Sequence, residues 1–134
     1  MKRLTFVVSG IFLIGLGAAT AAYAGSRSSN NAIKIDVGAR TITGALSDTR
    51  NSGDNVSWLA CDISVAEGDQ AVKVGVYAKD EWGEYAYCTS SNPLFVQTAL
   101  GLQADALVSV SYDAHNKCTQ IWTSRASHYA PKQP

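Results

Sequence analysis

The sequence predicts a mainly β domain, a curled antiparallel sheet (barrel or sandwich) that carries one short helix. Apolar and polar residues alternate with a period of two along several short segments. The connections between these segments are short and rich in Gly, Asp, Asn and Ser, and only one segment changes to helical spacing. A chain of 134 residues has the size of one domain. The alternation is imperfect, so barrel and sandwich both stay open.

The first 24 residues are typical of a secretory signal peptide. Lys2 and Arg3 give a basic start, an apolar run covers residues 4–17, and Ala22 and Ala24 supply the small residues of a cleavage site. A membrane-spanning helix needs about 20 apolar residues, and this run is shorter. We expect cleavage after Ala24 and a secreted or periplasmic protein with no stable membrane anchor; a retained N-terminal anchor is the alternative.

A flexible polar leader is expected over residues 25–31, followed by a single β-rich domain over 32–126. The alternation of Ile33 and Ile35 with charged neighbours predicts the first strand, and residues 41–43 predict the second. Residues 47–55 consist of Ser, Asp, Thr, Arg, Asn and Gly. Because such side chains compete for backbone hydrogen bonds, a loop is expected there.

A hairpin should follow, with strands over 56–65 and 72–77. In its first strand, Trp58 falls on the face opposite Leu59. Residues 80–84 then form a turn in which Gly83 takes positive φ. A short strand over 85–88 comes next.

The segment 93–102 is the one helix that we expect. Asn92 can cap its start, and Pro93 suits the first helical position. Two more strands are expected over 107–112 and 118–124. A C-terminal tail follows over 127–134.

The charge balance excludes a nucleic-acid-binding protein. Basic and acidic residues number 11 each, and phosphate contacts need clustered Lys and Arg. Removing Lys2 and Arg3 with the signal peptide leaves an excess of two acidic groups, which strengthens this exclusion. The sequence has no phosphate-binding glycine loop, no H-E-x-x-H and no G-x-S-x-G motif, so we expect no cofactor.

The three cysteines are Cys61, Cys88 and Cys118. An oxidising compartment allows them one intramolecular disulfide and leaves one thiol. The absence of a C-x-x-C pair removes support for a thioredoxin-like motif and for a clustered zinc site. A bridge between Cys88 and Cys118 would close a loop of about 30 residues and contribute about 3 to 4 kcal/mol. The spacing alone leaves the pairing open.

Three stretches carry a resemblance to known proteins. They are Gly-Ala-Leu-Ser-Asp-Thr-Arg-Asn-Ser-Gly-Asp (44–54), Tyr-Ala-Tyr-Cys-Thr-Ser (85–90), and Cys-Thr-Gln-Ile (118–121) with Ser-His-Tyr-Ala-Pro-Lys (127–132). Together they resemble a family of small secreted bacterial proteins without an assigned activity. In that family a further Cys occupies the strand that here reads Gly75-Val76-Tyr77. The resemblance implies export, a Cys88–Cys118 disulfide and a Cys61 without its partner, and it implies no mechanism.

Enzymatic chemistry finds little support. After removal of the signal peptide, the imidazole bases are His115 and His128. Asp113 and His115 precede Cys118 as in a Cys-His-Asp arrangement, but ordinary turn residues beside an oxidised cysteine explain the pattern better.

The acidic residues Asp80, Glu81 and Glu84 near Trp82 are better explained as a solvated turn than as a glycosidase pair.

A calcium site in the loop is also disfavoured. Asp48 and Asp54 flank Asn51 in an oxygen-rich segment, which suits calcium in principle. Arg50 stands where a ligand should be, so an Asx-rich turn explains the segment better. No metal site is expected.

Aromatic residues make binding the favoured function. Rings with a polar edge serve at protein interfaces and at sugar-stacking surfaces alike. If the sheet is covered on one side only, a strip of Trp58, Tyr77, Trp82 and Tyr85 would bind an extracellular protein or a glycan. If both faces are covered, these rings belong to the core. The alternatives are a small secreted hydrolase and a structural or assembly protein of the cell envelope, in which Cys61 links chains.

Overall fold

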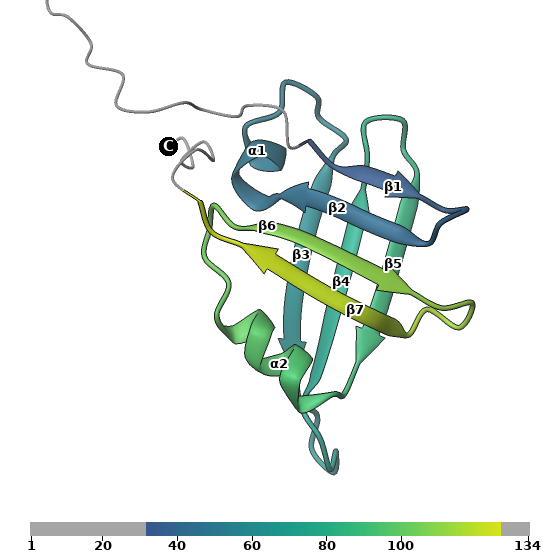
Figure 1. Ribbon diagram of the computed structural model, residues 1–134, viewed down its shortest axis with the longest axis vertical. Coiled ribbons are helices and arrows are strands. Elements are labelled where there is room, and N and C mark those ends of the chain that lie inside the picture. Colours follow the sequence, from purple (N-terminus) through teal and green to yellow (C-terminus); the bar gives the residue numbers. More distant parts are fainter. Residues whose placement is uncertain (1–31, 127–134) are drawn as a thin grey trace, which may run out of the picture.

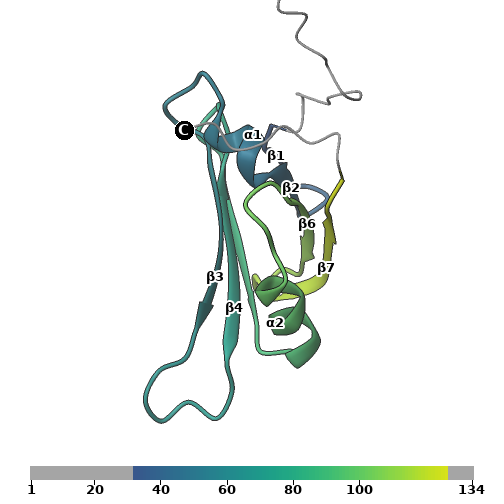
Figure 2. The ribbon, with the colours of Figure 1, turned by 90° about the vertical axis from the view of Figure 1, so that its left-hand side faces the viewer.

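A computed structural model describes residues 32–126, which form two antiparallel sheets packed face to face (Figure 1, Figure 2). One sheet has four strands in the order β1-β2-β6-β7: β1 (Lys34–Asp36), β2 (Thr41–Ala45), β6 (Leu107–Tyr112) and β7 (Cys118–Ser124). The other has three strands in the order β3-β4-β5: β3 (Trp58–Ser64), β4 (Lys73–Lys79) and β5 (Tyr85–Ser90). The mainly β prediction is confirmed, and the arrangement is a sandwich. The predicted signal peptide, leader and tail lie outside the described residues.

The core lies between the two sheets and follows from the period-two pattern. Val76 and Ala78 of β4 are fully buried, and they belong to the same cluster as Ile42 of β2 and Val108 and Val110 of β6. Alternate residues of a strand point to opposite faces, so the intervening side chains of β4 face outward. One face of the three-stranded sheet is therefore apolar and buried.

The predicted helix is present as α2 (Pro93–Leu100). The Asn92 side chain accepts a hydrogen bond from the Leu94 N–H at 2.9 Å, and Pro93 occupies the first helical position, as expected. Val96 and Ala99 pack against Val74 of β4. In Figure 2, α2 lies on the side of the three-stranded sheet that faces the other sheet, so it extends the cover of the inner face.

The prediction of a loop over residues 47–55 is wrong for residues 47–50. A short helix, α1 (Leu46–Arg50), forms there. The Leu46 N–H donates to the Ala106 carbonyl at 3.1 Å, and the Thr49 Oγ1 donates to the Ala45 carbonyl at 2.8 Å. Because Ser47 and Thr49 are buried, tertiary packing overrides the weak helix propensity of this polar segment.

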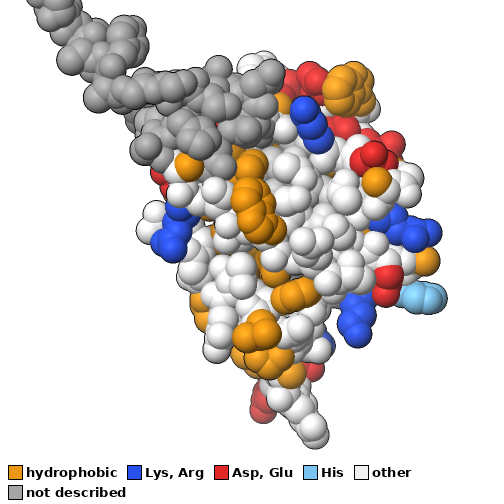
Figure 3. Space-filling model, in the orientation of Figure 1, with side chains coloured by type: hydrophobic (Ala, Val, Ile, Leu, Met, Phe, Trp, Pro, Cys, Tyr) orange, Lys and Arg blue, Asp and Glu red, His pale blue; other side chains and the backbone are white. Residues whose placement is uncertain are grey.

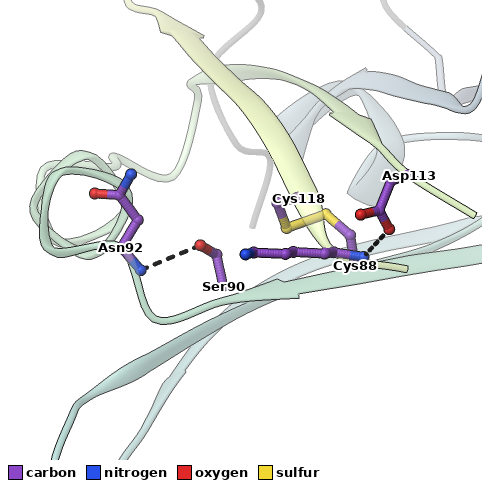
Figure 4. The surroundings of a disulfide bond; sticks show 6 residues. Cys88, Ser90, Asn92, Asp113 and Cys118 are labelled. Carbon is purple, nitrogen blue, oxygen red and sulfur yellow. Dashed lines mark hydrogen bonds between the residues drawn. A yellow bond between two sulfur atoms is a disulfide. The ribbon is translucent and has the colours of Figure 1, made fainter. Parts of the chain in front are cut away.

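A disulfide joins the two sheets at one corner (Figure 4). It links Cys88 of β5 to Cys118 of β7, with a Cα–Cα distance of 5.1 Å, and this is the pair that the family resemblance implies. Beside it, the Thr89 N–H donates to the Asn116 carbonyl at 2.9 Å. Both cysteines are buried. The bridge therefore ties the edge of the three-stranded sheet to the start of β7.

Candidate binding site

The outer face of the three-stranded sheet carries four aromatic rings. In the strand register, Trp58 and Tyr85 both lie opposite Lys79 of β4, and Tyr77 lies opposite Tyr87. The ring centroids are 5.9 Å apart for Trp58 and Tyr85, 6.0 Å for Tyr85 and Tyr87, and 6.1 Å for Tyr87 and Tyr77. We call Trp58, Tyr77, Tyr85 and Tyr87 the aromatic face. Its rings form one continuous chain of contacts across all three strands.

This face is open to solvent. The exposed fractions are 41% for Trp58, 48% for Tyr85 and 37% for Tyr87, while Tyr77 is half-buried. Both helices and the four-stranded sheet lie on the other side of the three-stranded sheet (Figure 2). Within residues 32–126 no helix or strand covers the rings. The sheet is thus covered on one side only, which was the condition for an exposed aromatic strip.

Gly75 determines how the Tyr77 ring lies. A Cβ atom at position 75 would come within 2.5 Å of the Tyr77 Cε2 and 2.6 Å of its Oη. The ring therefore lies along β4, over the backbone of Gly75, instead of standing away from the sheet. Its plane is tilted by only 11° from that of Tyr87. Gly75 is needed for this close approach, since any side chain there would push the ring aside.

The structure does not bring Trp82 to the aromatic face. Its side chain is 79% exposed and borders a shallow depression that is lined by Lys34, Thr41 and Thr43 of the other sheet. The backbone N–H of Trp82 donates to Asp80 Oδ1 at 3.1 Å, and Gly83 has the predicted positive φ of 86°. This turn geometry directs Trp82 toward the four-stranded sheet, so it does not join Trp58, Tyr77 and Tyr85 in one strip.

Tyr87 takes the place of Trp82 in the aromatic face. Sequence reasoning missed Tyr87, although it has the same parity as Tyr85 on an alternating strand and must share its face. That parity was sufficient to find it.

The outer face of the four-stranded sheet has a different character. Figure 3 looks onto this side, where hydrophobic groups are scattered among polar surface. Hydroxyl side chains alternate along β2 and β6, and the Thr43 and Ser109 oxygens are 2.8 Å apart. Trp122 of β7 is 49% exposed and makes no ring contact with the other described aromatic residues. No aromatic cluster comparable to the aromatic face forms among the residues described on this side.

A pocket of about 370 Å³ adjoins the aromatic face at the edge of β5. Tyr85 and Tyr87 line one wall, and Arg40, Tyr112 and Asn116 line the other. We call it the edge pocket. The Arg40 carbonyl accepts the Tyr112 N–H at 3.0 Å, which ties the turn before β2 to β6. Burial raises the pKa of the Tyr112 phenol, so this hydroxyl stays protonated at neutral pH.

Charges of both signs surround the rings. Lys79 lies between Trp58 and Tyr85, and Asp62 lies on the same face of β3. Asp113 also lines the edge pocket, and the backbone N–H groups of Lys117 and His115 hold its pKa below the usual range. Among residues 32–126 the one ion pair joins Lys73 to Asp69 at 3.3 Å. Lys79 and Arg40 therefore form no ion pair with another residue in the range 32–126.

The catalytic hypotheses gain nothing from the geometry. The Cys118 sulfur is in the disulfide, and His115 lies exposed in the β6–β7 turn, where its backbone N–H donates to Asp113 Oδ1 at 2.8 Å. Asp80 Oδ1 likewise accepts the backbone N–H groups of Trp82 and Glu84 and serves the turn. Within the described part of the chain no three metal-ligating side chains come together. His128 lies outside it.

Asp54, in the loop after α1, also serves the backbone. Asp54 Oδ1 accepts the Val56 N–H at 2.8 Å, and it accepts the Ser57 N–H as well. These hydrogen bonds, with that of Ser57 first, lower the pKa of the Asp54 carboxyl. The segment after α1 thus contains the Asx turn that the sequence analysis preferred to a calcium site.

Cys61 is the free thiol, and it points inward. It lies opposite Val76 in the register and packs against the core cluster. Burial, together with the nearby Asp62 carboxylate, raises its pKa to about 11. The thiol is therefore almost entirely protonated at neutral pH, which disfavours a role for Cys61 in linking chains.

We expect native Cys61 to react slowly with iodoacetamide. At pH 8 a pKa near 11 in place of 9.0 leaves a thiolate fraction on the order of 100-fold smaller. Alkylation followed by mass spectrometry should show a rate that climbs until about pH 11, and unfolding in denaturant should restore rapid reaction. Stability should also fall as pH rises from 9 toward 11, because the unfolded thiol ionises first. Rapid native labelling at pH 8, or disulfide-linked dimers on non-reducing electrophoresis, would contradict this placement.

Fold and site together define a small β-sandwich domain with one disulfide and one open aromatic face. Comparison with known proteins finds no matching family model, no matching curated protein and no matching solved structure. The resemblance to a family of small secreted proteins therefore stays a prediction. No helix within residues 32–126 has the length and apolar character needed to cross a membrane.

Proposed function

We propose that this protein is a secreted or periplasmic, non-enzymatic domain that binds a glycan on its aromatic face. The observation that carries the proposal is the continuous chain of four rings on an uncovered sheet. Sugar rings present apolar C–H faces that stack on aromatic side chains, and their hydroxyls need polar partners at the rim. Lys79 and Asp62 on the same face supply such partners.

A glycan fits this face better than a protein partner does. The centre of a protein interface is depleted in charged residues and is built around anchors that fill pockets. Here Lys79 lies between Trp58 and Tyr85, and the exposed Asp62 lies on the same outer side of β3, beyond Ala60. The rings lie on a sheet surface and do not project as isolated anchors. Charged and aromatic groups interleaved in this way suit a hydroxyl-rich ligand.

Two further observations support export. The disulfide is of a kind that persists in oxidising compartments. The basic and apolar start of the sequence is typical of a signal peptide. An assembly role through Cys61 is the less favoured alternative, because that thiol faces the core.

Glycan-array binding followed by titration calorimetry tests this function. Removing one ring of the face with Trp58→Ala should weaken binding of the captured glycan about tenfold. Trp122→Ala is the matched control, since it removes a similarly exposed indole from the other sheet and should leave the affinity unchanged. Equal losses from both variants would contradict the assignment, as would an array on which no glycan is retained.

A second variant of the same test keeps every ring. Gly75→Ala should displace the Tyr77 ring and weaken binding about three- to tenfold, which is the range of one aromatic contact. The ring is the free end of a side chain and can swing away, so the fold should tolerate the change. Gly53→Ala is its control, because nothing lies within 4 Å of a Cβ at that position.

A further inference from the structure

We infer that the glycan site continues around the edge of β5, and that the edge pocket takes one end of an uncharged oligosaccharide that lies on the aromatic face. This inference rests on the proposed function and specifies its ligand. Tyr85 and Tyr87 belong to both surfaces, since they contact Trp58 and Tyr77 on one side and line the edge pocket on the other. A ligand stacked on Trp58 and Tyr85 thus reaches the pocket without leaving aromatic surface.

The pocket has the size and the polarity for a single sugar unit. Its volume of about 370 Å³ lies near the lower end of ligand pockets, which span roughly 300 to 1,000 Å³. The Arg40 guanidinium donates hydrogen bonds, the Asp113 carboxylate accepts them, and the Asn116 amide does both. Such a mixture matches hydroxyl groups, which donate and accept at the same atom.

The pocket walls are held in place by the backbone. Arg40 and Asn116 both have left-handed φ values, 54° and 56°. The Arg40 carbonyl accepts from the Tyr112 N–H, and the Asn116 carbonyl accepts from the Thr89 N–H of β5. Asn tolerates this conformation by itself, whereas Arg40 keeps it because the surrounding structure enforces it. The two turns from which the polar side chains of the pocket project are therefore fixed by backbone hydrogen bonds.

The charge balance points to an uncharged ligand. Lys79 and Arg40 are offset by Asp62 and Asp113, which lie on the same two surfaces. Asp36 and Glu84 are also close enough to Tyr112 to affect its ionisation. A sugar acid would gain Arg40 and Lys117, which is close enough to Asp113 to affect its ionisation, but would face three carboxylates around the pocket. A neutral oligosaccharide meets no such repulsion.

Calorimetry with cello- and chito-oligosaccharides, from the disaccharide to the hexasaccharide, tests this inference, with oligogalacturonate as the acidic probe. Arg40→Asn removes the guanidinium and keeps a residue that tolerates left-handed φ. A hexasaccharide long enough to cover both surfaces should lose about tenfold in affinity with Arg40→Asn and, independently, with Trp58→Ala. A disaccharide should respond to only one of the two variants. Arg125→Asn, which removes an exposed arginine after β7, should change nothing.

The outcomes separate the two proposals. If Trp58→Ala weakens the hexasaccharide and Arg40→Asn does not, the edge pocket is not part of the site, while glycan binding on the aromatic face stands. Tighter binding of oligogalacturonate than of the neutral chains would overturn the uncharged ligand. If no oligosaccharide binds, both the inference and the proposed function fail.

Discussion

Replacing Cys88 and Cys118 together by alanine is expected to lower the free energy of unfolding by about 3 to 4 kcal/mol. The disulfide closes a loop with a sequence separation of 30 and thereby restricts the unfolded chain. It also joins β5 of one sheet to β7 of the other, where the isolated Thr89–Lys117 bridge is the one ladder contact described between the sheets. Urea unfolding of wild type and double variant, followed by tryptophan fluorescence, measures the difference.

The control for this prediction is Cys61→Ala, which removes the third cysteine and keeps the bridge. Its effect should be smaller, because Cys61 is only half-buried. Reduced wild-type protein gives a second comparison without any change of side chain. If reduction and the double substitution both cost less than about 1 kcal/mol, the sheets hold together without the disulfide, and loop closure is not a main source of stability.

Tyr85→Ala is expected to weaken glycan binding about 100-fold, a larger effect than that of Trp58→Ala. Tyr85 contacts Trp58 and Tyr87, and it also lines the edge pocket. Its removal therefore interrupts the chain of rings at its centre and opens the wall of the pocket. Calorimetry with the same hexasaccharide provides the measurement. The fold should survive, since the Tyr85 side chain lies on the outer face and is 48% exposed.

Tyr85→Phe distinguishes stacking from hydrogen bonding at this position. It keeps the ring and removes the hydroxyl, so it should retain the affinity to within about tenfold. A loss in Tyr85→Ala no greater than that in Trp122→Ala would show that the face does not bind the ligand. Circular dichroism of each variant checks that the sheet is intact.

Much of the architecture follows from local patterns in the chain. The period-two alternation located the strands and separated Trp58 from Leu59 across the sheet, because successive side chains point to opposite faces. Asn92 and Pro93 located the start of α2, because a side-chain cap and a fixed φ act within one turn. Three cysteines limited the chain to one intramolecular bridge.

Contacts between distant segments decided the rest. Trp58 meets Tyr85 because both lie opposite Lys79 in the register, and register depends on how three strands pair. Trp82 leaves the predicted strip because the hydrogen bonds of its turn direct it toward the other sheet. The polar segment 46–50 forms α1 because burial against neighbouring strands outweighs its own preference for a loop.

The sequence by itself therefore determined which residues form strands and which side of a strand each ring occupies, since both depend on neighbours in the chain. The tertiary structure alone decided that the aromatic side is open, that its rings contact one another across three strands and that the edge pocket extends it. Those properties depend on which surfaces the folded chain buries. Segments that are distant in the sequence cover one another only after folding has brought them together.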